Sequence, residues 1–115
     1  MIFTMNDFIS HLMDTESFAK ALESIQLTSK EKADLGELFA NKRGILVTRD
    51  KGNRVRGDTV YSCSKIGKYL TAYFDGTRPG DLMMWVGILE TKNDGSELWK
   101  MRPEVRSAIE RLRWF

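Results

Sequence analysis

Apolar residues in the first forty positions recur three and four places apart, which is the spacing of amphipathic helices. This pattern predicts a short helix over Met5–Met13. It also predicts a second helix, which Thr15 can cap and whose apolar face carries Phe18, Leu22 and Ile25. The first part of the chain is therefore expected to be helical.

The third helix of this part carries the clearest boundary signals. Thr28 and Glu31 have the spacing of a capping box, in which two side chains satisfy backbone N–H groups of the first turn. We expect Lys42 and Arg43 in its last turn, where cations suit the helix dipole, and Gly44 just beyond its end. Its apolar stripe consists of Leu35, Leu38 and Phe39.

The residues that follow favour strands. Ile45–Arg49 predicts a strand, and Asp50–Asn53 supplies the turn of a hairpin, because glycine and asparagine tolerate a positive φ. The returning strand is expected from about Arg54 to Cys63. Ser64–Phe74 fits either a helix or a strand, and the helical spacing of its apolar residues favours the helix.

A nearly continuous apolar run over Leu82–Glu90 predicts a central strand that is covered on both faces. The Asn-Asp-Gly sequence within residues 92–96 is a hairpin turn signal, and it leads to a partner strand over Leu98–Met101. Pro103 fits the first turn of a final helix. The apolar stripe of that helix consists of Val105, Ile109 and Leu112.

Together these elements predict an α+β fold in a single domain over residues 1–115. An N-terminal three-helix segment precedes a small, mainly antiparallel sheet of about four strands, with one intervening and one C-terminal helix. Three helices followed by a hairpin also suggest a winged-helix-like arrangement. The third helix would then expose a mixed to acidic face, unsuited to base-specific readout, with Lys30, Glu31, Lys32, Asp34 and Glu37.

The single cysteine and the hydropathy pattern bear on location. Cys63 alone excludes an internal disulfide bond and a zinc site built from cysteines, and it suits a reducing compartment. The first residues lack the basic and apolar regions of a signal peptide. The run Leu82–Leu89 is far shorter than the roughly 20 residues that span a bilayer. We therefore expect a cytoplasmic protein without membrane contact.

The net charge of +2 hides an uneven distribution. Residues 1–40 carry three basic and seven acidic residues, and residues 41–80 carry nine basic and three acidic residues. Residues 81–115 carry six of each. Blocks of opposite sign give a molecule a dipolar field that steers charged partners.

Ionisable residues that could act together in catalysis are scarce. His11 is the only histidine, and it stands 52 positions before Cys63. The sequence contains neither a zinc-binding histidine motif nor a phosphate-binding glycine loop. Acidic pairs such as Glu31 with Asp34 are expected on solvated helix faces. These observations predict a non-enzymatic protein without a cofactor or a metal ion.

Three short stretches are Tyr61–Ser64, Arg78–Leu82 and Val86–Ile88. Together they resemble fragments of cell-wall NlpC/P60-type cysteine peptidases. Tyr61–Ser64 is similar to the cysteine–serine pair that opens a helix in that family. Arg78–Leu82 and Val86–Ile88 are similar to its PGD-like turn and VGI strand. The family's histidine would fall at Trp85 of this chain. Because that histidine is missing, the resemblance does not imply peptidase activity.

The strongest remaining signal is the positive charge around the predicted hairpin. Lysine and arginine can neutralise phosphates of nucleic acid, and tyrosine rings can stack on unpaired bases. Charges on an edge strand also prevent edge-to-edge pairing without any ligand. The candidate binding residues are Lys42, Arg43, Arg49, Lys51, Arg54, Arg56, Lys65, Lys68 and Tyr69.

We therefore expect a small intracellular binding protein. The first hypothesis is a nucleic-acid-associated regulator whose basic hairpin contacts the backbone of DNA or RNA. The alternative is a protein-directed inhibitor or adaptor, which binds an acidic protein surface by protein–protein contact.

Overall fold

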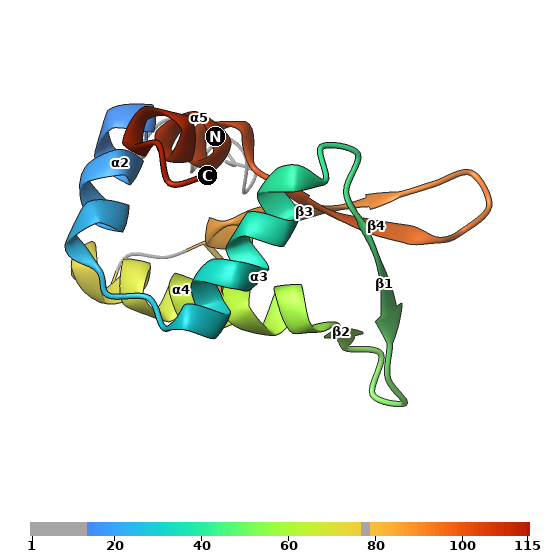
Figure 1. Ribbon diagram of the computed structural model, residues 1–115. Helices are drawn as coiled ribbons and strands as arrows, with labels where there is room; N and C mark the ends of the chain where they lie inside the picture. Colours follow the sequence, from blue (N-terminus) through green and yellow to red (C-terminus); the bar gives the residue numbers. More distant parts are fainter. Residues whose placement is uncertain (1–13, 77–78) are drawn as a thin grey trace, which may run out of the picture.

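The computed structural model describes residues 14–76 and 79–115, and this part of the chain has an α+β fold with four α-helices and a four-stranded antiparallel sheet (Figure 1). The helix predicted over Met5–Met13 lies outside the described residues. Within them, no helix is long and apolar enough to cross a bilayer. The elements in chain order are α2 (Thr15–Ser24), α3 (Ser29–Ala40), β1 (Ile45–Arg49), β2 (Val55–Arg56), α4 (Asp58–Tyr73), the 3-10 helix η1 (Leu82–Trp85), β3 (Gly87–Thr91), β4 (Glu97–Met101) and α5 (Pro103–Leu112).

Helix α2 begins one residue earlier than its predicted cap implies. The carboxylate of Asp14 accepts the backbone N–H of Ser17 at 2.8 Å, so Asp14 is the N-cap and Thr15 is already helical. Both residue types cap helices well, and a one-residue shift satisfies the same free N–H groups. Phe18 and Leu22 of the predicted apolar face are fully buried, whereas Ile25 lies just after the helix and is half-buried.

Helix α3 confirms the predicted capping box. The Thr28 hydroxyl accepts the Glu31 N–H at 3.1 Å, and the Glu31 carboxylate accepts the Thr28 N–H at 2.9 Å. The prediction that Lys42 and Arg43 lie in the last turn of this helix is wrong. The helix ends at Ala40, and these two residues form the turn after it. Asn41 caps the end of the helix. Its side-chain amide and its backbone N–H both donate to the carbonyl of Glu37, which would otherwise lack a partner at the helix end.

The long returning strand that was predicted up to Cys63 is wrong. Strand β2 contains only Val55 and Arg56, and α4 begins at Asp58 after Gly57, which has a φ of +152°. The β-propensity of this stretch is outweighed by burial, because helical spacing brings Val60, Cys63, Ile66 and Leu70 onto one buried face. The helix preferred for Ser64–Phe74 is confirmed as the larger part of α4.

The sheet order is β2-β1-β4-β3, with every neighbouring pair antiparallel. The predicted central strand over Leu82–Glu90 is wrong in two respects: its first part is the helix η1, and β3 lies at the edge of the sheet. Trp85 and Val86 are nevertheless buried, because η1 inserts them between the helices. The apolar run therefore reflects burial against helices, and the inner strands of the sheet are β1 and β4.

The second hairpin and the final helix match their predictions. Lys92 donates its N–H to the carbonyl of Ser96 at 2.8 Å, and Gly95 takes a φ of +88° in the turn between β3 and β4. Pro103 is the first residue of α5. Both signals act over a few neighbouring residues, which explains why the sequence alone revealed them.

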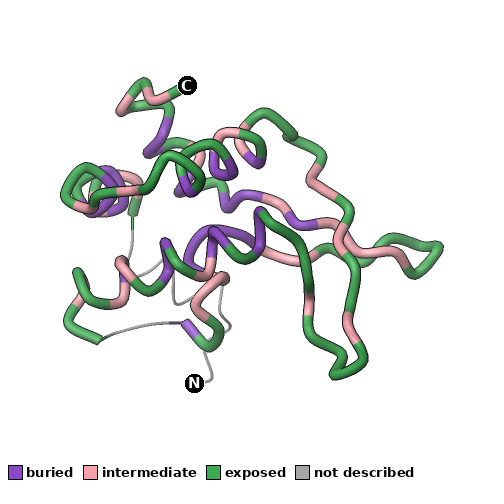
Figure 2. The backbone as a smooth tube through the Cα atoms, turned by 60° about the horizontal axis from the view of Figure 1, so that its bottom comes forward, coloured by how far each residue is buried: buried purple, intermediate pink, exposed green. Residues whose placement is uncertain are grey.

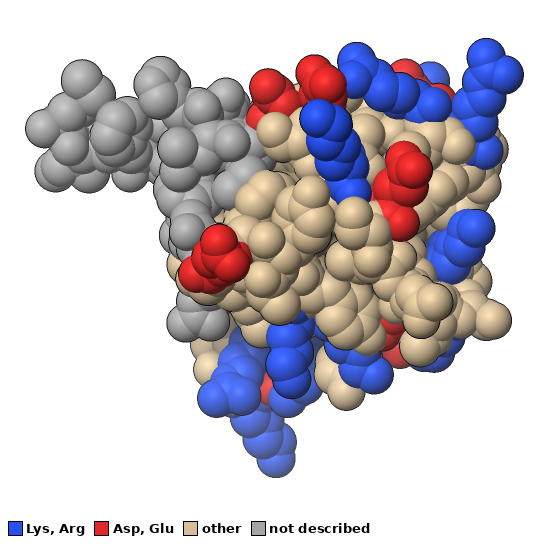
Figure 3. All heavy atoms as spheres, turned by 90° about the vertical axis from the view of Figure 1, so that its left-hand side faces the viewer, with Lys and Arg blue, Asp and Glu red and all other residues tan. Residues whose placement is uncertain are grey.

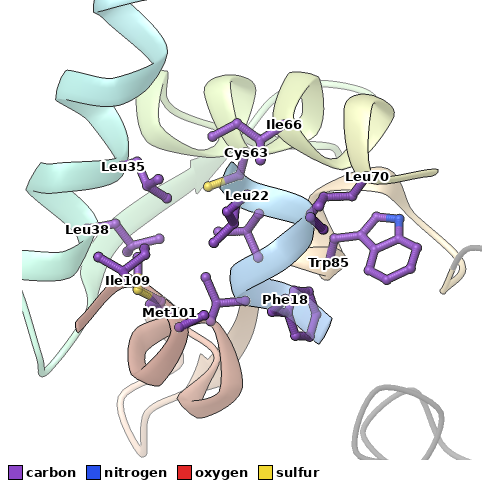
Figure 4. Close-up of a cluster of buried hydrophobic side chains, with 14 of the residues drawn as sticks. Phe18, Leu22, Leu35, Leu38, Cys63, Ile66, Leu70, Trp85, Met101 and Ile109 are labelled. Atoms are coloured by element: carbon purple, nitrogen blue, oxygen red, sulfur yellow. The ribbon is translucent and has the colours of Figure 1, made fainter. Parts of the chain in front are cut away.

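The hydrophobic core lies among the four helices, η1 and strand β4 (Figure 4). Its largest fully buried side chains include Trp85, Trp99, Phe18 and Ile109. In Figure 2 buried positions concentrate on the helices, whereas the ends of both hairpins are exposed. The sheet extends from the helical body, with the β3–β4 turn reaching farthest to the right and the β1–β2 turn below it, on the side of α4 (Figure 1).

Candidate functional site

The structure divides the nine candidate residues into separate places. Lys42 and Arg43 form the turn before β1, whereas Arg49 is the last residue of β1 and the other cations lie beyond that end or on α4. Strand β1 has five residues, so these two ends are roughly 16 Å apart. Lys42 and Arg43 therefore belong to a different surface from the hairpin turn.

Arg49 forms an ion pair between two strands of the sheet. Its Nε and Nη2 donate to the two carboxylate oxygens of Glu97 at 2.6 and 2.8 Å, and its Nη1 donates to the Asn53 carbonyl at 2.7 Å. The hydrogen bond to Glu97 raises the pKa of Arg49, and the same bond lowers the pKa of Glu97. This bidentate ion pair joins β1 to β4 and stabilises the hairpin. The carboxylate of Glu97 compensates the positive charge of Arg49, so Arg49 is a weaker candidate for ligand binding.

Arg56 is paired as well. Its Nε and Nη2 both lie 2.7 Å from the same carboxylate oxygen of Asp50. The other oxygen of Asp50 accepts the backbone N–H of Arg54 at 2.9 Å, and this bond is the main cause that lowers the pKa of Asp50. The side chains of Lys51 and Arg54 are exposed and make no hydrogen bond or ion pair with another described residue.

Helix α4 continues this positive surface. Tyr61, Lys65 and Lys68 are spaced four and three residues apart, so they share one exposed helix face. The Lys65 ammonium group lies 4.9 Å from the centre of the Tyr61 ring, which is 60% exposed. Figure 3 shows Lys and Arg side chains gathered along its lower edge, the side on which α4 and the β1–β2 turn lie in Figure 1.

Tyr69 lies on a different face of α4 from Tyr61. Its hydroxyl donates to the Glu31 carboxylate at 3.0 Å, and this bond raises the pKa of Tyr69. The side chain is half-buried between α3 and α4. The exposed aromatic residue beside the cations is therefore Tyr61, which the sequence showed only as one of several interleaved tyrosines.

Two carboxylates predicted on a solvated face are buried. Glu31 and Asp34 are 3% and 8% exposed, and they face α4. Asp34 accepts hydrogen bonds from the Ser62 hydroxyl and from the Lys30 ammonium group. The sequence carried a signal for this burial, because positions 31, 34, 35 and 38 form one helical stripe. Their charge suggested that both residues are exposed. Hydrogen bonds from α4 instead offset the free-energy cost of burying the two carboxylates.

Cys63 lies in the hydrophobic core. Cys63 is 1% exposed, and this burial raises the pKa of its thiol to about 12, although the Trp99 indole opposes the shift. His11 lies outside the described residues, and Trp85 is buried in the core. The described residues contain no group of three or more His, Cys, Asp or Glu side chains that could hold a metal ion.

We expect the Cys63 thiol to react with a disulfide reagent only when the protein opens. At mildly alkaline pH a thiol with a pKa of about 12 is ionised in only about one molecule in 10⁴, and its sulfur is covered. The reaction, followed by absorbance, should be slower than that of the denatured protein by at least about 100-fold. Equally fast reaction of the native protein would contradict the buried placement and would restore Cys63 as a candidate nucleophile.

The candidate site is thus a set of exposed cations around the β1–β2 turn and on α4, with the exposed ring of Tyr61 beside Lys65. No protein-family model matches this chain, and neither does any curated protein or solved structure.

Proposed function

We propose that this protein binds the backbone of nucleic acid through a basic face made of Lys51, Arg54, Tyr61, Lys65 and Lys68. The observation that carries the proposal is the continuity of two exposed elements. Helix α4, which carries Tyr61, Lys65 and Lys68, begins two residues after β2 ends, and α4 and the hairpin turn lie along the same lower side of the molecule (Figure 1).

The chemistry of the basic face fits phosphates. Lysine and arginine side chains without an intramolecular partner can replace the counterions of a phosphate chain, and the released ions favour binding. The exposed ring of Tyr61 offers a surface on which an unpaired base can stack. Because no amide or guanidinium group is fixed for bidentate contact with a base edge, we expect little sequence preference.

The other candidate residues take supporting or separate places in this proposal. Arg49 and Arg56 shape the hairpin through Glu97 and Asp50. Lys42 and Arg43 lie at the other end of β1 and provide a matched control. The winged-helix-like arrangement stays a prediction, since it requires a helix that lies outside the described residues.

The test is a salt titration of oligonucleotide binding. A variant with Lys51, Arg54, Lys65 and Lys68 all replaced by alanine should bind short single-stranded DNA and RNA at least about 100-fold more weakly. The slope of log affinity against log salt should fall by roughly 3, because four phosphate contacts are lost. Fluorescence anisotropy of labelled oligonucleotides measures both quantities.

A second variant controls for net charge. Replacing Lys42 and Arg43 by alanine removes two positive charges from the separate surface and should change the affinity by less than about threefold. The proposal fails if the unmodified protein binds no oligonucleotide at low salt. It also fails if the two variants lose the same affinity per charge removed.

A further inference from the structure

A groove of about 970 Å³ opens on the face of the sheet that carries Arg49. One wall is the β1–β2 hairpin, and the other is the segment of residues 80–84 that includes the start of η1. The half-buried side chains that line it are mostly apolar: Val55, Leu82, Met83, Met84 and Leu89. Val55, Met83 and Leu89 also pack against the core, so the groove is a half-buried apolar surface at the margin of the core.

The wall that carries the methionines is held in place by a buried arginine. Arg102 is 2% exposed, and its Nε donates to the backbone carbonyl of Met84 at 2.6 Å. This bond connects the start of α5 to η1, so the backbone beneath the Met84 side chain is fixed while the side chain lines the groove. A preformed wall of this kind lowers the entropic cost of binding.

The groove carries one positive side chain without an internal partner. Arg49 also lines it, but its Nε and Nη2 donate to the Glu97 carboxylate and its Nη1 donates to the Asn53 carbonyl. Arg54 lines the groove on the hairpin side, and its guanidinium group makes no hydrogen bond or ion pair with another described residue. The acidic lining residue is Asp81 on the opposite wall. A ligand that reaches Arg54 is therefore expected to carry a negative group.

The lining favours a protein segment over a nucleobase. Unpaired bases bind by stacking on accessible aromatic rings, and the aromatic residue of this groove, Trp99, is 1% exposed. Methionine and aliphatic side chains instead adapt to apolar side chains of different shapes. Tyr61, which can stack on a base, is not among the lining residues.

We propose that this groove binds a short segment of another protein that combines apolar and acidic residues. The apolar side chains of the bound segment contact Met83 and Met84, and one of its carboxylates pairs with the guanidinium group of Arg54. This interaction goes beyond the proposed nucleic-acid binding. The two ligands share Arg54 but otherwise contact different residues.

The test is a selection of peptides from a random dodecapeptide library displayed on phage, with the full chain as the bait. The selected peptides should combine Leu, Ile or Phe with Asp or Glu. Met84→Asp and Arg54→Glu should each weaken the binding of the selected peptides at least about tenfold, as measured by anisotropy. Leu46→Asp is the matched control, because Leu46 is 66% exposed on the opposite face of β1, and it should change binding less than about twofold.

Several outcomes would overturn this inference. Failure to enrich any peptide would do so, as would peptides that bind Met84→Asp and Leu46→Asp equally well. A dimer of the unmodified chain that Met84→Asp dissociates would show that a second copy fills the groove. If Met84→Asp weakens oligonucleotide binding as much as peptide binding, the groove belongs to the nucleic-acid surface.

Additional variants keep the two proposals separate and control for folding. Replacing Lys65 and Lys68 by alanine should weaken oligonucleotide binding and leave peptide binding unchanged. If Met84→Asp lowers the thermal midpoint, the exposed substitution Arg54→Glu and the milder Met84→Ser decide the result. Retention of peptide binding by both of these folded variants would reject the groove as the site.

Discussion

Replacing Gly67 by alanine should cost at least about 3 kcal/mol of unfolding free energy. A Cβ atom at this position would lie 1.9 Å from the carbonyl oxygen of Leu82 and 2.6 Å from its carbonyl carbon. These are backbone atoms of η1, so no side-chain rotation relieves the clash, and α4 and η1 must separate. Urea unfolding followed by circular dichroism measures the effect.

Gly52→Ala is the matched control for this substitution. Its φ is not positive, and the nearest group to an added Cβ is the Asp50 carboxylate at 3.4 Å. We expect a change within about 0.5 kcal/mol of the unmodified protein. If Gly67→Ala is equally mild, α4 and η1 cannot be in the contact that the structure describes. Because η1 forms a wall of the groove, that result would also remove the basis of the peptide proposal.

Trp85→Ala should destabilise the protein by about 3–5 kcal/mol, the usual cost of removing a large aromatic side chain from a core. Trp85 is fully buried, stacks on Phe74 with ring centres 5.3 Å apart, and meets the edge of Phe18 at 6.1 Å. Its indole N–H donates to the Thr71 hydroxyl at 2.8 Å. The loss should appear as a lower urea midpoint in the same unfolding assay.

Trp85→Phe separates packing from hydrogen bonding. The phenyl ring retains most of the apolar contact with Phe18 and Phe74, whereas the hydrogen bond to Thr71 is lost. We expect a smaller loss of about 1–2 kcal/mol. If phenylalanine costs as much as alanine, the polar contact and not the ring packing governs the stability of this site.

Several predictions that rest on short-range signals were confirmed, although the cap of α2 shifted from Thr15 to Asp14. Thr28 and Glu31 form their capping box, Pro103 opens α5, and the turn at Gly95 joins β3 to β4. Each of these signals involves residues within about one helical turn or one hairpin turn. The periodic apolar residues also identified much of the core, including Phe18 and Ile109.

Predictions that depended on packing partners failed more often. The stretch around Val60 has β-branched and aromatic residues, but burial of its helical face against the core makes it part of α4. The apolar run that includes Trp85 predicts a central strand, but a continuous apolar sequence indicates only that the segment is buried. Whether such a segment is a helix or a strand depends on the distant elements that pack against it.

The candidate site shows the same division. The sequence by itself determined where positive charge concentrates and which segments form the hairpin turn. Only the tertiary structure decided which cations are available, because the partner of Arg49 is Glu97, 48 positions away. It also separated Lys42 and Arg43 from the basic face and turned Tyr69 toward Glu31. Pairing between distant residues is a property of the folded chain, since local sequence does not specify which charges meet.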